Sequence, residues 1–462
     1  MLLSLNSESP VALVDQIVGG IRRQIDDRLL RPGMRLAPIR GFAEQNKVSR
    51  FTVVEAYDRL VALGYLQSRR GSGFFVAPRP SALPAEQRGG DVMRDFGNAG
   101  VLLEETGGRL KVGAGWLPPE WLDEAGVRRN IRSLARRGDA RVTSYGAPFG
   151  YRPLRDHLQF RLGELGIGAR PSQIVLTHGA TQALDLVARY LLKAGDCVFV
   201  DDPGYWNLFA NLRLYGVNLV GIPRTAGGPD PDALEALLAE HRPKAFFTHS
   251  VLHNPTSGNL SPANAFRILQ LADKHDFLIV EDDAYGDFHP GPATRLAQLD
   301  QLRRVIYVGS FAKTLSASLR VGFLACDPEL AANLSDVKIV SALSTSEFSE
   351  QLVYLMLTEG HYRKFIDRIH GRLAEATDRT LRLLERCGLS IHAEPKGGMF
   401  VWAAAPGVND AARLASDAAQ AGILLAPGNL FRPQMQPSPC LRFNVAYAPD
   451  VRLERFLGEA FR

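Results

Sequence analysis

The chain has 462 residues, of which 46% are hydrophobic and 22% are charged, and its formal net charge is +5. This length exceeds that of one ordinary domain and predicts two to four domains, while the composition is that of a globular protein with a large buried core. No run approaches the ~18 consecutive apolar residues of a bilayer-spanning helix, so we expect no membrane-spanning helix.

The sequence shows no sign of secretion. Residues 1–10 are polar and lack a basic segment followed by an apolar stretch, so no secretory signal is expected. The cysteines form no Cys-x-x-Cys pair, so neither a zinc site nor a disulfide framework is indicated. They are Cys197, Cys326, Cys387 and Cys440. We expect free thiols that act as small apolar residues in the reducing cytosol, and therefore a cytoplasmic protein without a metal.

Two helices are predicted first in the chain. Over residues 10–30, every fourth position is apolar, which is the pattern of a helix with one buried stripe. The stripe consists of Leu13, Ile17, Ile21, Ile25 and Leu29. The sequence Arg31-Pro32-Gly33 stops this helix. A short second helix can begin at Pro38, since proline is tolerated in the first turn, and would bury Ile39, Phe42 and Ala43.

A third helix and a β-hairpin follow. Ser49 is a suitable N-cap for a helix that runs to about Leu63. Its inward face would consist of Val53, Ala56, Tyr57 and Leu60. Two short strands, at 65–66 and 74–76, flank the turn Arg69-Arg70-Gly71-Ser72-Gly73. Three helices followed by a hairpin with arginine and glycine at its tip predict a winged helix-turn-helix over residues 1–78.

The charge of this segment favours a polyanionic partner. Residues 1–78 hold eleven lysines and arginines against seven aspartates and glutamates, a net charge of +4. In a winged helix the third helix lies in the major groove, and neighbouring groups hold phosphates. Any single arginine could equally be a solvated surface residue. As a group, the expected contacts to double-stranded DNA are Arg40, Ser49, Arg50, Thr52, Arg69, Arg70 and Gly71.

Residues 36–76 resemble the GntR family of bacterial winged-helix regulators. The residues that match the family's hallmarks are Leu36, Pro38 and Arg40 before the second helix, and Val48, Ser49 and Arg50 at the start of the third. This resemblance implies binding to operator DNA. Phe51 departs from the family, which commonly carries a polar or small residue at that position, so no base contact is assigned to it.

The composition changes after the hairpin. From residue 78 to about 90 the chain is rich in proline, alanine, glutamine, arginine and glycine, and we assign 79–111 to a linker. Over 112–462, apolar strand-like runs alternate with helical patterns, which predicts a mostly parallel sheet with helices on both faces. The clearest runs are 174–176, 197–200, 245–247, 277–280 and 305–308.

Chemically useful residues follow several of these strands. His178-Gly179-Ala180-Thr181-Gln182 opens a helix whose N–H groups could hold a phosphate. Asn254, after another strand, could donate to a ring oxygen of a ligand. Asp282 could pair with a protonated pyridine nitrogen, and Tyr285 could bond the phenolic oxygen of the same ring.

The fourth segment carries an amine. Lys313 follows a strand and could form a Schiff base with an aldehyde, while Ser310 and Arg320 could hold a phosphate. Each segment alone has an ordinary explanation as a turn, a helix cap or a surface charge. Because loops at the carboxyl ends of strands converge in open α/β sheets, the four segments together predict one cofactor site.

The order and spacing of these segments resemble fold-type I pyridoxal-phosphate aminotransferases over about 112–462. That resemblance implies an α/β fold with a large domain at about 165–325, a small domain at about 330–462, and pyridoxal 5'-phosphate as cofactor. It makes Lys313 the Schiff-base lysine, Asp282 the partner of the pyridine nitrogen and Tyr205 the aromatic that stacks on the ring. The ring oxygen would contact Asn254 and Tyr285, and the phosphate would contact Gly179, Ala180, Thr181, Ser310 and Arg320.

Three further features come from the same resemblance. Arg442 would clamp the carboxylate of an amino-acid-like effector, again through its fork of donors. Tyr145-Gly146 and Gly150 resemble the family's entrance loop. Ala312 departs from the many relatives that carry serine before the lysine, which removes one possible phosphate contact.

The whole chain resembles the MocR arrangement, in which a GntR-type domain, a linker and an aminotransferase-like domain are joined. This implies a transcription regulator that senses pyridoxal phosphate, or an amino acid or amine that condenses with it, and a head-to-tail homodimer. Two alternatives stay open. The chain could be a working aminotransferase with an accessory DNA-binding domain, with Lys313 as the base, or a DNA-binding protein whose second domain is only a scaffold.

Overall fold

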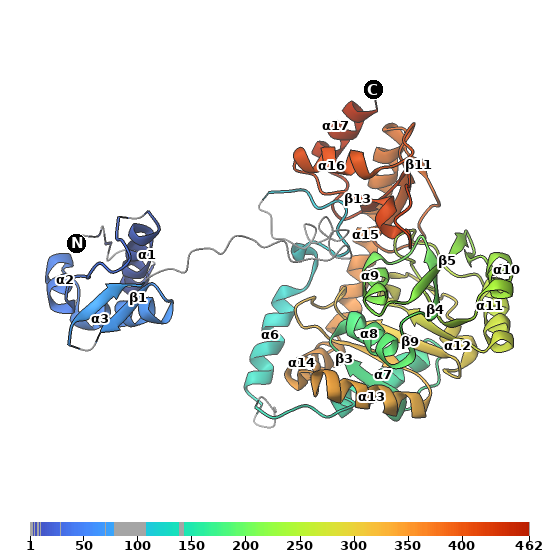
Figure 1. Cartoon of the computed structure of the whole chain (residues 1–462), viewed down its shortest axis with the longest axis horizontal. Coiled ribbons are helices and arrows are strands. Elements are labelled where there is room, and N and C mark those ends of the chain that lie inside the picture. Colours follow the sequence, from blue (N-terminus) through green and yellow to red (C-terminus); the bar gives the residue numbers. More distant parts are fainter. Residues whose placement is uncertain are drawn as a thin grey trace. The chain divides into compact units, whose positions relative to one another are not determined.

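The computed structural model describes residues 3, 5, 6, 9, 11–27, 29–69, 71–77, 108–137 and 143–461. The chain divides into two compact units, Met1–Gly90 and Asp91–Arg462 (Figure 1). Among the described residues, no helix is long and apolar enough to cross a membrane.

The first unit is a winged helix-turn-helix, as predicted. Its described helices are α1 (Leu13–Asp26), α2 (Ile39–Asn46) and α3 (Arg50–Ala62). The antiparallel pair β1 (Leu66–Arg69) and β2 (Gly73–Val76) forms the wing. One apolar core joins these elements, and it contains Ile17, Ile21, Ile25, Phe42, Val53, Ala56, Tyr57, Leu60, Leu66 and Val76.

Ser49 caps α3, because its Oγ accepts a hydrogen bond from the backbone N–H of Thr52 at 3.0 Å. All four residues predicted on the inward face of α3 are buried. The first helix was predicted too long: α1 ends at Asp26, and Leu29 is exposed beyond it, since the chain turns there. Pro38 is the N-cap of α2, one residue before the first turn in which we expected it.

The second unit is built on an eight-stranded sheet of order β3-β10-β9-β8-β7-β4-β5-β6. Its strands are β3 (Ile174–Thr177), β4 (Cys197–Asp202), β5 (Asn218–Thr225), β6 (Gly228–Pro229), β7 (Pro243–Thr248), β8 (Leu278–Asp282), β9 (Val305–Ser310) and β10 (Gly322–Ala325). Strands β5, β4, β7, β8 and β9 pair in parallel, whereas β10 is antiparallel to both of its neighbours and β6 is antiparallel to β5. The prediction of a mostly parallel sheet is confirmed.

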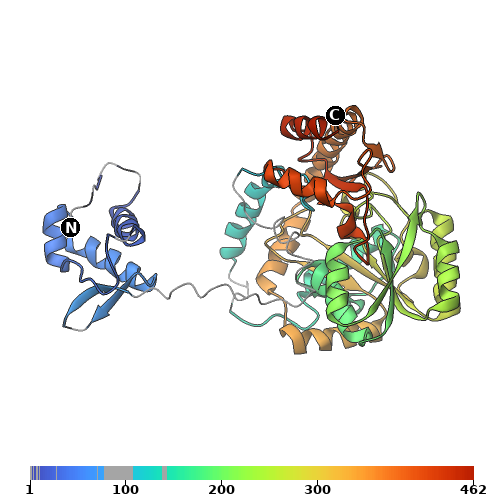
Figure 2. The same ribbon diagram turned by 45° about the horizontal axis from the view of Figure 1, so that its top comes forward.

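Helices cover both faces of this sheet (Figures 1 and 2). Successive residues of a strand point to opposite faces, so Val198 and Val200 of β4 pack in one core while Phe199 packs in the other. The described α-helices of this unit are α6 (Glu124–Ala135), α7 (Arg152–Glu164), α8 (Gly179–Leu191), α9 (Trp206–Leu214), α10 (Pro231–Glu240), α11 (Pro262–His275), α12 (Leu296–Asp300), α13 (Pro328–Ala342), α14 (Glu347–Thr358), α15 (His361–Arg386), α16 (Ala412–Gln420) and α17 (Val451–Ala460). Because both faces are buried, the central strands are mainly apolar, and most of their charged residues lie at the carboxyl ends, as Asp201, Asp202 and Asp282 do.

A second, smaller sheet has the order β11-β12-β14-β13 and is antiparallel. It consists of β11 (Ser390–Ile391), β12 (Phe400–Ala404), β13 (Ala426–Pro427) and β14 (Cys440–Asn444). Leu110, which we predicted to lie in the linker, is buried and forms a β-bridge with Ile423. The residues before the large sheet therefore pack on the C-terminal part of the unit.

All four cysteines are free thiols, as expected. Cys326 is buried, and the other three are half-buried. Burial raises the pKa of the thiol in each of them.

A buried ion pair holds the loop that follows β8. The Nε of Arg295 donates to Oδ2 of Asp283 at 2.7 Å, and the hydroxyl of Tyr307 donates to the same oxygen at 2.6 Å. The side chains of Arg295 and Asp283 are only 6% and 3% exposed. The carboxylate thus depends on Arg295 and Tyr307 for the compensation of its charge.

The substitution Arg295→Leu should lower the free energy of unfolding by about 3–5 kcal/mol, because it leaves an uncompensated charge at Asp283. Urea unfolding of the full chain measures this. The matched control is Arg303→Leu, which breaks the exposed 3.0 Å pair between Arg303 and Asp273 and should cost less than about 1 kcal/mol. Equal losses in the two variants would contradict the prediction.

Candidate functional site

The residues predicted to bind the cofactor lie at one edge of the large sheet. Most of them follow β3, β7, β8 or β9, whereas Tyr205 follows β4 and Arg320 precedes β10. A cavity at this edge is lined by Ala180, Thr181, Tyr205, His249, Asn254, Asp282, Ala284, Tyr285, Ser310, Ala312, Lys313 and Arg320. Nine of these residues were predicted cofactor contacts, and the tenth predicted contact, Gly179, is the first residue of α8 beside the cavity. The structure therefore brings the whole predicted set together.

The N-terminus of α8 forms one wall of the cavity. Gly179, Ala180 and Thr181 are its first residues, so their N–H groups have no intrahelical partner and carry the positive end of the helix dipole. Arg320 donates from Nη2 to the carbonyl oxygen of His178 at 3.1 Å, which holds the guanidinium beside the helix end. These groups form a site suited to a phosphate.

Ser310 completes this wall. Its Oγ accepts a hydrogen bond from the N–H of Ala312 at 3.2 Å, which leaves the hydroxyl hydrogen available as a donor. Ala312, which departs from the family pattern in its side chain, thus contacts Ser310 through its backbone N–H.

Two glycines allow the close approach of backbone to backbone at the helix end. Gly179 has φ +75°, and a Cβ there would lie 3.0 Å from Nη2 of Arg320. A Cβ on Gly322 of β10 would lie 2.7 Å from the Cα of Gly179. Gly322 was not predicted from the sequence, because only its proximity in space to α8 indicates a role.

Lys313 points its amine into the cavity. Its Nζ donates to the carbonyl oxygen of Gly115 at 2.7 Å and lies 5.6 Å from the centre of the Tyr285 ring. Burial, together with the positive charge of Arg442, lowers the pKa of Lys313 to about 8, although Asp282 acts in the opposite direction. Near neutral pH an appreciable fraction of the amine is therefore neutral, which is the form that attacks a carbonyl carbon.

Asp282 ends β8 and is buried. Its Oδ1 accepts a hydrogen bond from the N–H of Ala284 at 3.0 Å, and its Oδ2 lies 3.2 Å from Nε2 of His249. The ring of His249 stands edge-on to Tyr205, with 6.3 Å between the ring centres. His249 was not predicted from the sequence, although its position directly after β7 was the same signal that identified the other residues.

A second buried carboxylate, that of Asp201, fixes the position of His249. Asp201 accepts hydrogen bonds from the N–H of His249 at 3.1 Å and from the hydroxyl of Thr248 at 3.0 Å. Arg224 forms a buried ion pair with it at 2.8 Å. The end of β7 is therefore fixed by hydrogen bonds to a charged group, which are stronger than neutral ones.

The same region has the ligand types of a metal site. One ligand atom each from Asp201, His249 and His253 lies within 4.8 Å of the others. The carboxylate of Asp201 is already paired with Arg224, whose positive charge opposes a cation at this position. We therefore assign this cluster a structural role.

Arg442 lies on β14 and is buried. Its Nη1 donates to Oδ1 of Asn254 at 2.7 Å, and its Nη2 donates to the carbonyl oxygen of Gly113 at 2.6 Å. Its Nε has no partner among the described residues. Burial lowers the pKa of Arg442 to about 10, so the guanidinium remains positive at neutral pH.

The bond from Arg442 also orients Asn254. Because Oδ1 of Asn254 is the acceptor, its amide nitrogen remains able to donate to a ligand in the cavity. Tyr205 and Tyr285 lie in the same lining, and burial raises the pKa of both hydroxyls. They are therefore protonated and able to donate hydrogen bonds.

A wider cavity of about 720 Å³ shares Lys313, Tyr205 and other residues with the first, and Arg442 lines it as well. This volume is in the range of pockets that hold small molecules. Its outer lining includes Arg109, Lys111, Trp116, Asn207 and Tyr447. There is room for a ligand next to a cofactor.

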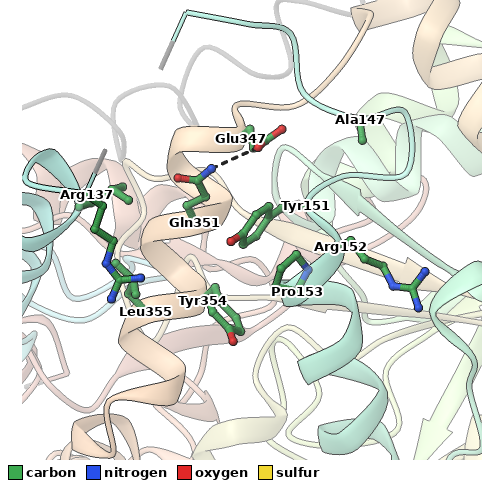
Figure 3. Close-up of a pocket in the computed structure, with 10 residues that line it drawn as sticks. Arg137, Ala147, Tyr151, Arg152, Pro153, Glu347, Gln351, Tyr354 and Leu355 are labelled. Atoms are coloured by element: carbon green, nitrogen blue, oxygen red, sulfur yellow. Dashed lines mark hydrogen bonds between the residues drawn. The ribbon is translucent and has the colours of Figure 1, made fainter. Parts of the chain in front are cut away.

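The residues that resemble the entrance loop lie elsewhere. The N–H of Gly146 donates to Oγ of Ser344 at 3.2 Å, and Tyr145 is exposed. A separate cavity of about 290 Å³ lies nearby, where Tyr151 faces α14 (Figure 3). It contains a hydrogen bond from Nε2 of Gln351 to Oε1 of Glu347 at 3.1 Å and none of the predicted cofactor residues.

In the first unit, the predicted DNA contacts at α2 and α3 are at the surface. Arg50 is exposed at the start of α3, and the hydroxyls of Ser49 and Thr52 lie 2.7 Å apart. Arg40 is exposed and donates from Nε to Glu44 at 3.0 Å. This pair is open to solvent, so a phosphate could compete for the guanidinium.

Two of the residues predicted to contact DNA lie in the described part of the wing. The guanidinium of Arg69 lies 4.5 Å from the centre of the Phe75 ring. Gly71 has φ +76°, which the tight turn between the strands requires. Arg70 lies outside the described residues.

Comparison with known proteins identifies both units. Residues 122–459 match the family "Aminotransferase class I and II", and residues 13–76 match "Bacterial regulatory proteins, gntR family". The HTH-type transcriptional regulator YdfD of Bacillus subtilis (strain 168) is 26% identical over 460 residues, which cover 96% of this chain and 94% of YdfD. The probable rhizopine catabolism regulatory protein MocR of Rhizobium meliloti is 29% identical over 394 residues, covering 81% of this chain and 77% of MocR.

A solved structure matches the second unit. LysN, the alpha-aminoadipate aminotransferase of Thermus thermophilus, superimposes with a TM-score of 0.72 and 29% identity. The match covers 80% of this chain and 97% of LysN, whose structure is a complex with N-(5'-phosphopyridoxyl)-L-leucine.

The lowered pKa of Lys313 predicts how its reactivity depends on pH. In the chain freed of small molecules, the rate at which Lys313 reacts with pyridoxal, used as an aldehyde probe, should rise with pH and level off above about 8. Exposed lysines, with pKa values near ~10.4, should still be gaining reactivity there. Absorbance of the imine measures the rate, and Lys313→Ala supplies the background to subtract. A rate that keeps rising up to pH 10 would contradict this assignment.

Proposed function

Because the chain belongs to the aminotransferase class I and II family and begins with a gntR-family domain, we propose that it is a MocR-type transcription regulator controlled through a pyridoxal-phosphate site. Both family resemblances inferred from the sequence are confirmed. In this proposal the first unit binds double-stranded operator DNA. The second unit binds the cofactor and an effector.

One observation carries the proposal: an amine, a carboxylate and a phosphate cradle face the same cavity. Lys313 offers the amine, Asp282 the carboxylate, and the N-terminus of α8 with Arg320 the cradle. These three groups match the aldehyde, the pyridine nitrogen and the phosphate of pyridoxal 5'-phosphate. When bound, this cofactor supplies an aldehyde carbon that condenses with amines.

The remaining lining residues fit the same ligand. Asn254 and Tyr285 can donate to the ring oxygen, Tyr205 can stack on the ring, and Ser310 can add a hydrogen bond to the phosphate. The buried His249 and Asp201 keep Asp282 in place. The residues present are therefore sufficient to hold the cofactor.

The effector is proposed to be an amino acid, an amine or pyridoxal phosphate itself. Arg442 favours a ligand with a carboxylate, because its guanidinium is positive and lines the wider cavity. A carboxylate there would use the Nε that lacks a partner among the described residues, and would compete with Asn254 and Gly113 for the other two nitrogens. Binding at this point would therefore change the hydrogen bonds that link β14 to the edge of the large sheet.

We propose that such a change alters the affinity for the operator, because a ligand that binds one of two states more tightly shifts the population toward that state. The regulator is proposed to act in the cytoplasm as a head-to-tail homodimer. The homodimer is inferred from the resemblance to the MocR arrangement.

The competing function is that of a working aminotransferase. The presence of Lys313, Asp282, Arg320 and Arg442, and the similarity to LysN, favour this alternative. The regulator is favoured over it, since the similarity to YdfD covers 96% of the chain, including the gntR-family domain. The same intact residues argue against a second unit that is only a scaffold.

The regulator proposal predicts that effector and operator binding are linked. An amino acid that changes the absorbance of the cofactor should change the operator affinity by about five- to 150-fold, measured by fluorescence anisotropy of a labelled duplex. The variant Lys313→Ala should lose both responses. Unchanged affinity with every amino acid that alters the absorbance would contradict the proposal, and steady turnover with a keto acid would favour the aminotransferase.

The close packing of Gly322 against the start of α8 leads to a second prediction about cofactor binding. The substitution Gly322→Ala adds a methyl group that overlaps the backbone of Gly179, so the end of α8 must shift. Overpacking of this kind should weaken pyridoxal-phosphate binding by about tenfold or more, measured by absorbance titration. Gly371→Ala is the control, because a Cβ there meets nothing within 4 Å, and equal affinities in the two variants would contradict this role of Gly322.

A further inference from the structure

The surface of α3 carries one large apolar side chain at the end that enters DNA. Phe51 is the second residue of the helix, and 77% of its surface is exposed. On the opposite side of the same helix, Val53, Ala56 and Tyr57 are fully buried. The aromatic ring therefore belongs to the outward face and takes no part in the core of the unit.

Phe51 lies at the N-terminal end of α3, beside residues that are also exposed. With about 3.6 residues per turn, Phe51 shares the outward face with Val54 and Glu55 one turn later, and Val54 is 36% exposed. Arg50 directly precedes Phe51 and is exposed at the N-terminal end of the helix. In a helix-turn-helix, this end of the recognition helix contacts the base edges.

The distribution of charge along α3 also favours contact with DNA through its first turn. Arg50 is exposed and positive in the first turn, whereas Glu55 and Asp58 are exposed further along. Arg59, in the last turn, is paired with Asp15 at 2.8 Å. Acidic side chains are repelled by phosphates, so the later turns are kept away from the DNA backbone. The first turn, with Arg50 and Phe51, is left to approach the floor of the groove.

The major groove offers one apolar group to such a ring, the C5 methyl of thymine. We propose that Phe51 reads a thymine methyl in the operator, and that Val54 extends the apolar contact. This inference rests on the proposed function, and it revises the expectation from the sequence that Phe51 makes no base contact. It adds a specificity-determining residue at the position where the chain departs from its family. Adjacent Cα atoms are about 3.8 Å apart and base pairs rise about 3.4 Å, so the thymine should lie within about one or two base pairs of the base that Arg50 contacts.

The test removes the methyl group and the ring in turn. Operator duplexes are first selected from a random pool with the full chain, and each thymine is then replaced by deoxyuridine, which lacks only the C5 methyl. For the wild-type chain, one replacement in each half-site should weaken binding by about fourfold, as expected for one buried methyl group. The variant Phe51→Ala should bind the original operator more weakly and show no response to that replacement.

A matched control keeps the result interpretable. Phe160→Ala removes a similarly exposed phenylalanine, 64% exposed, from α7 of the second unit and should leave the response to deoxyuridine unchanged. Because Phe51 lies outside the core, its variant should keep the wild-type melting temperature, which thermal unfolding checks.

Three outcomes would overturn the inference. Wild-type operator affinity in Phe51→Ala would show that the ring does not contact DNA, and an unchanged deoxyuridine response in that variant would show that another residue reads the methyl. A changed sedimentation coefficient in Phe51→Ala with an unchanged methyl response would identify the ring as a protein contact. Failure of the wild-type chain to select any duplex would instead contradict the proposed function itself.

Discussion

The site depends on the parallel course of β4, β7, β8 and β9. Parallel strands place their carboxyl ends at one edge of a sheet, so the segments after β7, β8 and β9 meet there although they are far apart in the sequence. The antiparallel β10 brings Gly322 against the start of α8 and thereby fixes the distance between the helix end and the sheet. The hydrogen bonds that Asp201 accepts from His249 and Thr248 then fix the end of β7 next to Asp282.

The two units divide the chemistry of the chain between them. Nearly all of the excess positive charge lies in residues 1–78, where a polyanion is recognised by charge and by the outward face of α3. In the second unit Asp282 and Arg442 are buried, Lys313 is half-buried and Arg320 is exposed beside the start of α8. These charges line cavities in which they meet a small ligand at close range. A fold alone does not assign a function. The proposed function here follows from the residues on the outward face of α3 and from those that line the cavity of the second unit.

Some helices and site residues could be predicted from the sequence to the residue, whereas others could not. The start and the inward face of α3 could be predicted to the residue, because Ser49 is a capping residue and the apolar residues have helical spacing. Leu29 has the same spacing but is not in α1, since periodicity does not record where the chain turns. Within the site, residues next to strand ends were found, whereas Gly115 and Gly322 were not. Their roles arise from contacts with distant residues, such as the bond from Lys313 to Gly115 across 198 positions.

The four thiols have a consequence for how the chain responds to its surroundings. Burial raises the pKa of each cysteine, and the thiolate is the form that reacts with peroxides and alkylating agents. At neutral pH these four thiols are therefore mostly protonated and react slowly with such reagents. The same inertness means that a cysteine engineered at a solvent-facing position would be the most reactive one, and could carry a fluorophore that reports on conformational change without first removing the native residues.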